Sequence, residues 1–148
     1  MTARSVKKAK TQTDKNPLRV QLRTLSRALR DVHRALVEFS RDRYELENGP
    51  IEGKAQLLDL LLRDDAFAWL RPMSRLIVTI DQLAGRRPVP SEDEVAAIRA
   101  RVEAFIEPGA PNSFGSRYCG LLPSEPDVTK HHGVLREAIR DLPEATAA

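Results

Sequence analysis

The chain has few of the residue patterns that mark an enzyme, a secreted protein or a membrane protein. Its 148 residues include a single cysteine, Cys119, which excludes an internal disulfide framework. No apolar run is long enough to cross a bilayer, and no signal-peptide pattern opens the chain. A glycine-rich phosphate loop, a zinc-ligand spacing and a Ser-His-Asp pattern are all missing. These absences favour a cytoplasmic protein, and they predict no catalytic residue, no metal site and no cofactor.

Positive charge is scarce outside the first residues. The chain carries a net charge of +3, but residues 1–16 hold five basic residues and one acidic residue, whereas the remainder holds 19 basic and 20 acidic residues. Residues 1–15 are therefore predicted to form a disordered basic tail, which either solubilises the protein or acts as an arm for nucleic acid. A nucleic-acid-binding domain usually carries its positive excess on the folded body, so a nucleic acid partner is not favoured. Residues 16–143 are predicted to form a single helical domain, with a disordered C-terminus at 144–148.

The strongest periodic signal predicts a long helix that begins at Asn16-Pro17. Asn is a favoured N-cap, and Pro in the first turn sacrifices no hydrogen bond. Gly49-Pro50 is expected to end the helix near Asn48. Apolar residues recur at spacings of three and four, as in a coiled-coil seam: Leu18, Leu22, Leu25, Leu29, Val32, Leu36 and Phe39.

The opposite face of this helix carries an arginine stripe made of Arg23, Arg27, Arg30, Arg34 and Arg41. Such a stripe can bind phosphate groups. However, Asp31, Glu38 and Glu45 each follow an arginine by four residues, a spacing that allows ion pairs along the helix. The sequence favours a solvated, ion-paired face.

Residues 53–85 are predicted to form a second long arm. Its first part, Gly53 to Arg63, has leucines around more than half of the helix, so it must be buried on several sides or meet another chain. After a break near Asp64-Asp65, where Asp64 can cap the next turn, the stretch from Asp64 to Asp81 carries the only tryptophan. Pro72 predicts a kink or a restart beside Trp69 and Arg71.

Two shorter helices are predicted in the last third of the chain. Ser91 and Glu94 have the spacing of a capping box and start a helix that stops before Pro108. Residues 107–123 show no period and are expected to be irregular. A second capping pattern begins at Ser124 and precedes a helix that ends at Pro143, within which Gly133 suggests a close approach of another backbone.

These elements predict an all-α, four-helix bundle-like domain with two long and two short helices. The segment from Gly49 to Asp81, with FAWLRP followed by Ser, Leu, Ile and Asp, resembles a family of small uncharacterised bacterial all-helical proteins. The resemblance covers the chain from the first helix to Asp81 and is weaker afterwards. It implies an all-helical fold and no particular activity.

Two functions remain open beside the nucleic-acid arm. The leucine-rich surface favours a non-enzymatic protein that works by association, as a homo-oligomer or with a helical protein partner. Alternatively, an aromatic loop folded over the Pro72 bend would create a small-molecule anion site or an enzyme pocket. Its residues would be Trp69, Arg71, Tyr118 and, where the last helix packs against the second arm, His132.

Overall fold

The computed structural model describes residues 15–145, so nearly all of the predicted basic tail and residues 146–148 lie outside the described residues. Within that range the protein is all-α, as predicted, with six α-helices, one 3-10 helix and no β-strand. The elements are α2 (Pro17–Asn48), α3 (Gly53–Arg63), η1 (Asp65–Leu70), α4 (Arg71–Gly85), α5 (Glu92–Ile106), α6 (Phe114–Leu121) and α7 (Pro126–Arg140).

Helix α2 is the longest element and carries the predicted seam into the core. Its N-cap, Asn16, accepts hydrogen bonds from the backbone N–H groups of Leu18 and Arg19, which confirms the predicted start. At the other end Gly49 has φ +85°, a left-handed conformation that costs glycine little. The middle of the seam is fully buried at Leu22, Leu25, Leu29, Val32 and Leu36.

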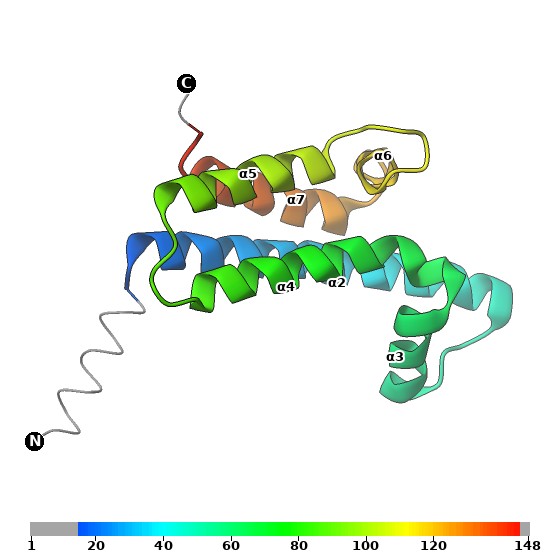
Figure 1. The fold of residues 1–148 in the computed structure, drawn as a ribbon. Coiled ribbons are helices and arrows are strands. Elements are labelled where there is room, and N and C mark those ends of the chain that lie inside the picture. Colours follow the sequence, from blue (N-terminus) through cyan, green and yellow to red (C-terminus); the bar gives the residue numbers. More distant parts are fainter. Residues whose placement is uncertain (1–14, 146–148) are drawn as a thin grey trace, which may run out of the picture.

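The other helices are arranged around α2. Helices α4 and α7 both pack along α2, and α5 lies next to α7 (Figure 1). Helix α3 stands apart, because it packs mainly against η1 and projects from the end of the α2–α4 pair (Figure 1). The core is therefore shared by α2, η1, α4, α5, α6 and α7, with α3 at its margin.

The predicted second arm consists of three elements, α3, η1 and α4, and its first break falls at Asp64, as predicted. Helix α3 ends at Arg63, and the Asp64 carboxylate caps η1 by accepting a hydrogen bond of 2.9 Å from the Ala66 N–H. Pro72 lies in the first turn of α4, where its missing N–H costs nothing. The helix restarts at this point, so Pro72 does not interrupt a helix interior.

Three predictions for the last third of the chain were wrong. Residues 114–121 form α6, so the segment 107–123 is not wholly irregular. The Ser124 hydroxyl donates back to the Leu121 carbonyl and does not cap α7. A Cβ at Gly133 would have no non-neighbouring atom within 4 Å, so no backbone comes close there. The capping box of Ser91 and Glu94, in contrast, is confirmed at the start of α5.

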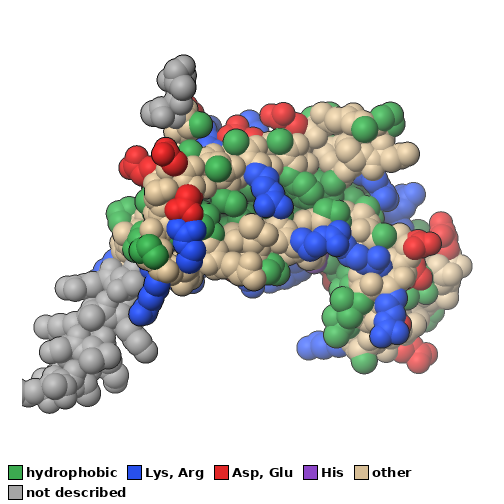
Figure 2. Space-filling model, in the orientation of Figure 1, with side chains coloured by type: hydrophobic (Ala, Val, Ile, Leu, Met, Phe, Trp, Pro, Cys, Tyr) green, Lys and Arg blue, Asp and Glu red, His purple; other side chains and the backbone are tan. Residues whose placement is uncertain are grey.

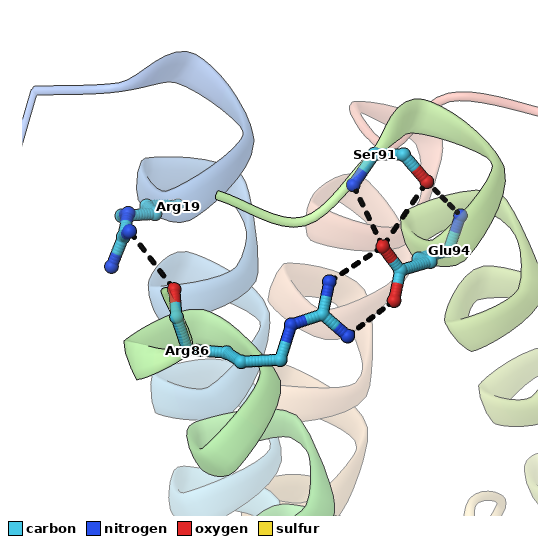
Figure 3. Close-up of polar contacts among 4 residues, drawn as sticks. All are labelled: Arg19, Arg86, Ser91 and Glu94. Carbon is cyan, nitrogen blue, oxygen red and sulfur yellow. Dashed lines mark hydrogen bonds and ion pairs between the residues drawn. The ribbon is translucent and has the colours of Figure 1, made fainter. Parts of the chain in front are cut away.

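Arginine side chains that are distant in the sequence cap the C-terminal ends of several helices. Arg19 of α2 is buried and donates to the carbonyl oxygens of Ala84 and Arg86, at 3.1 and 2.9 Å. Figure 3 shows the contact between Arg19 and the Arg86 carbonyl oxygen. The Arg86 side chain is turned away from Arg19, towards Glu94 and the Ser91 cap. That ion pair and the Ser91 cap lower the pKa of the Glu94 carboxyl to about 2. Cations suit helix C-termini because the last carbonyl groups have no partner within the helix.

The arginine stripe on α2 is ion-paired in part. Arg41 pairs with Glu45 at 3.3 Å, as predicted, whereas Arg34 pairs with Asp31 rather than Glu38. Arg30 reaches across to Asp81 on α4, whose other carboxylate oxygen accepts a hydrogen bond of 2.6 Å from Ser26. Through Arg30, the stripe thus contributes to the contact between α2 and α4. In the described part of the chain, no helix is both long and apolar enough to cross a membrane.

Candidate functional site

A continuous column of aromatic rings joins η1, α6 and α7. The Phe114 ring stacks on Trp69 with 5.6 Å between centroids and on Tyr118 with the same separation. Phe105 of α5 also stacks on Phe114, with 4.3 Å between centroids. The column ends at His132, whose ring meets Tyr118 edge-on at 5.3 Å. Three of the four predicted site residues, Trp69, Tyr118 and His132, therefore belong to one cluster.

Helix α6 places Phe114 and Tyr118 in this column because it docks closely on the end of α5. Ser113 caps its first turn by accepting from the Ser116 N–H. Gly115 is buried against the C-terminal end of α5, where no side chain fits. The Ser116 hydroxyl bonds to the backbone of Gly109. The helix has only eight residues and two glycines, so it lacks the periodic signal that identifies longer helices.

Tyr118 and His132 are joined by a hydrogen bond inside the column. The phenol oxygen lies 2.7 Å from His132 Nδ1, and the tyrosine is fully buried. Burial raises the pKa of Tyr118 above its ordinary value, so the phenol stays protonated. Burial, with the nearby Arg136 charge, lowers the pKa of His132. A neutral imidazole that accepts a hydrogen bond from the phenol O–H at Nδ1 satisfies both groups, which favours a structural role for this pair.

Arg71 does not join the aromatic column. Its guanidinium donates to the carbonyl oxygens of Leu61 and Asp64, at 3.0 and 2.9 Å, and so caps the C-terminal end of α3. The physical reason is that Arg71 begins α4 directly after the short η1, which places it beside the carbonyl groups at the end of α3. Arg71 holds α3 in place through its Nε and Nη2 donors.

A cleft of about 200 Å³ lies beside Trp69 and contains two arginines that the sequence analysis did not single out. The Arg117 guanidinium lies 4.4 Å from the Trp69 ring centroid, and Arg43 lies 5.5 Å from the ring centroid of Phe39. The indole N–H of Trp69 donates to the buried Ser40 hydroxyl at 3.3 Å. The contact of Arg43 with Phe39 could have been predicted from their i+4 spacing on one helix. The contact of Arg117 with Trp69 could not, because it depends on where α6 docks.

Two of the larger hollows have other chemistry. One of about 350 Å³ lies between α2 and the start of α7, and five of the eleven residues that line it are acidic. The other, of about 560 Å³, is an apolar groove between α4 and α5 lined by Leu83 and Ile98, with Arg101 at its edge. Figure 2 shows apolar side chains in the furrow between these two helices.

The remaining titratable candidates are engaged in structural contacts. The Cys119 thiol donates to the Ile106 carbonyl oxygen, and burial raises its pKa, which supports the prediction of an unreactive thiol. His33 shares a hydrogen bond of 3.0 Å with Ser74, and burial lowers its pKa. Among residues 15–145, no group of three or more histidine, cysteine or acidic side chains is placed to hold a metal ion.

Comparisons of the chain with protein-family models, curated proteins and solved structures find no match. The resemblance of the FAWLRP segment to a bacterial helical family therefore stays a prediction.

Proposed function

We propose that the protein acts through self-association, as a homodimer joined by the outer face of α3. The observation that supports this proposal is the exposure of two leucines on one helix face. Leu58 and Leu62 are 57% and 62% exposed, and their spacing of four residues places them side by side. Only Leu60 of this helix is buried, while Leu57 and Leu61 pack partly on the core.

The position of α3 makes this face accessible. The helix projects from the end of the α2–α4 pair, so a second molecule can approach it without displacing another element (Figure 1). Figure 2 shows the same region as a separate lobe with apolar side chains on its surface, close to arginine and lysine side chains. Paired apolar side chains on a projecting helix are typical of association surfaces.

The charges next to the leucines favour a second copy of the chain as the partner. Asp59 and Arg63 form an exposed ion pair of 3.3 Å within the helix. In an antiparallel, two-fold arrangement, Leu58 would meet Leu62 of the second copy, and Asp59 would meet Arg63 of the second copy. The face is thus complementary to itself, as an isologous interface requires.

The interface is small, so the dimer is expected to be weak. A face of one 11-residue helix buries less than the roughly 1,200 Å² of a standard interface. We therefore expect a dissociation constant in the range of roughly 10–100 µM. Sedimentation of the full chain across that range should show a monomer–dimer equilibrium.

Charge reversal provides the sharpest test. Asp59→Arg should weaken the dimer by about tenfold, because the new arginine of each copy then faces Arg63 of the other copy, which makes two repulsive pairs. The double variant Asp59→Arg/Arg63→Asp should restore the dimer. Leu58→Gln/Leu62→Gln should give a monomer at all concentrations, while Val134→Gln, at a half-exposed apolar position on α7, should not. A wild-type monomer at about 500 µM, or a double reversal no better than the single one, would exclude this interface.

The other predicted functions have less support. Nucleic acid binding would depend on residues 1–15, all of which except Lys15 lie outside the described residues. A ligand site centred on Arg71 would require donors that already bind the carbonyl groups of α3.

A further inference from the structure

The cleft beside Trp69 has the composition of a ligand site, and it is independent of the α3 face. We propose that this cleft binds a small aromatic monocarboxylate, whose carboxylate pairs with Arg43 and Arg117 while its ring lies against Trp69 and Tyr44. Both arginines and both aromatic residues line the same cleft.

The two guanidinium groups are held in place but retain free hydrogen-bond donors. Arg117 lies over the Trp69 ring, and Arg43 lies over the Phe39 ring, so each is oriented by an aromatic face rather than by a carboxylate. Between residues 15 and 145, neither side chain forms an ion pair or donates a hydrogen bond. A planar guanidinium that is always charged matches the geometry of a carboxylate.

The net charge of the walls indicates an anion with a single negative charge. Glu47 also lines the cleft, so the two arginines and this one carboxylate leave an excess of one positive charge. A monocarboxylate neutralises this excess, whereas a dianion such as a phosphate monoester would leave the cleft with a net negative charge and costs more to remove from water. The cleft is therefore better suited to a carboxylate than to a phosphate.

The size and the remaining walls indicate a single ring. A volume of about 200 Å³ is smaller than the roughly 300–1,000 Å³ of typical drug-sized sites, so it has room for one six-membered ring and its acid group. Trp69, Tyr44 and Ala66 supply apolar surface. Ser40 lies at the cleft wall and accepts the Trp69 indole N–H, and within the described range its hydroxyl donates to no other group.

Calorimetric titration of the full chain with benzoate tests this site. We expect a dissociation constant on the order of 0.1–1 mM, given the number of non-hydrogen atoms in benzoate. Acetate, which lacks the ring, benzyl alcohol, which lacks the charge, and phenyl phosphate, which carries a second charge, should each bind at least tenfold more weakly. Trp69 is the only tryptophan, so the fluorescence of the protein reports on this cleft. The emission should change during the titration with benzoate and not during the titrations with the three comparison compounds.

Variants separate the site from general anion binding. Arg43→Gln and Arg117→Gln should each weaken benzoate binding at least fivefold, whereas Arg27→Gln, at an exposed position on the same helix as Arg43, should leave it unchanged. Glu47→Gln should reduce the preference for benzoate over phenyl phosphate. Thermal unfolding curves would verify that each variant is folded, and dimer formation should be unaffected by all four.

Several results would overturn the proposal. They are an absence of benzoate binding at about 10 mM, equal binding by wild type and the folded Arg43 and Arg117 variants, or tighter binding of acetate or phenyl phosphate than of benzoate. None of these results would bear on the α3 interface, because the two surfaces share no residue.

Discussion

Gly115 of α6 lies directly against the carbonyl group of Glu107, at the end of α5. A Cβ built at Gly115 would be 1.7 Å from the Glu107 carbonyl oxygen and 2.6 Å from its carbon. Both atoms belong to the backbone, so they cannot move away as a flexible side chain would. This contact fixes how α6 docks, and α6 supplies both Phe114 and Arg117 to the region around Trp69.

Replacing Gly115 with alanine should therefore displace α6. We expect Gly115→Ala to lower the free energy of unfolding by about 2–4 kcal/mol, measured by urea denaturation, and to weaken benzoate binding. The matched control is Gly120→Ala in the same helix, where an added Cβ has nothing within 4 Å. That change should be neutral or stabilise by up to about 1 kcal/mol, because alanine favours the helix. Equal effects of the two substitutions would contradict the close contact.

Gly133 is expected to behave in the opposite way to Gly115. It lies in α7 with no atom near its missing Cβ, so Gly133→Ala should raise the free energy of unfolding by about 0.5–1 kcal/mol. Thermal and urea denaturation would measure this gain. A loss of stability would indicate a backbone contact at Gly133 that the structure does not contain.

Arg71 should stabilise α3 rather than bind a ligand. Arg71→Met keeps most of the side-chain bulk but removes the two hydrogen bonds to Leu61 and Asp64. We expect a loss of about 1–3 kcal/mol and faster amide hydrogen exchange within α3. Arg75→Met, an exposed arginine one turn further along α4, should change neither quantity. If Arg71→Met weakened benzoate binding without affecting α3, the assigned role would be incorrect.

Acidification should destabilise the protein through two half-buried histidines, His33 and His132. The pKa values of His33 and His132 are lowered from 6.5, each chiefly by burial, so the folded state holds both rings neutral. Their contribution to stability is complete above pH 6.5 and is lost as the pH falls from there towards the folded pKa values, because the unfolded chain binds protons first. Urea unfolding at a series of pH values should show this loss.

His132→Asn provides the comparison for that titration. The variant should lose less stability than wild type over the same pH range, leaving the part that depends on His33. Proton NMR titration of the His132 ring should give a pKa below 6.5 in the folded protein. A wild-type ring that titrates above 6.5, or a variant with unchanged pH dependence, would contradict the buried neutral imidazole.

The helix boundaries set by local caps were determined by the sequence. Asn16 caps α2 through N–H groups two and three residues away, and Ser91 and Glu94 cap α5 within one turn. Gly49 ends α2 by its own backbone conformation. Such signals involve neighbours in the chain and do not depend on how the helices pack, so they can be recognised before the fold is known.

Contacts between distant residues were decided only by the tertiary structure. Arg19 belongs to the polar side of an amphipathic pattern, yet it is buried because α4 ends beside it, 65 residues later in the chain. Arg71 and Arg117 are both arginines close to aromatic residues in sequence, but only Arg117 faces Trp69. Which guanidinium reaches the indole depends on the docking of α6, and that docking depends on backbone contact at Gly115. A sequence pattern specifies the faces of each helix, whereas the identity of the facing group is set by packing.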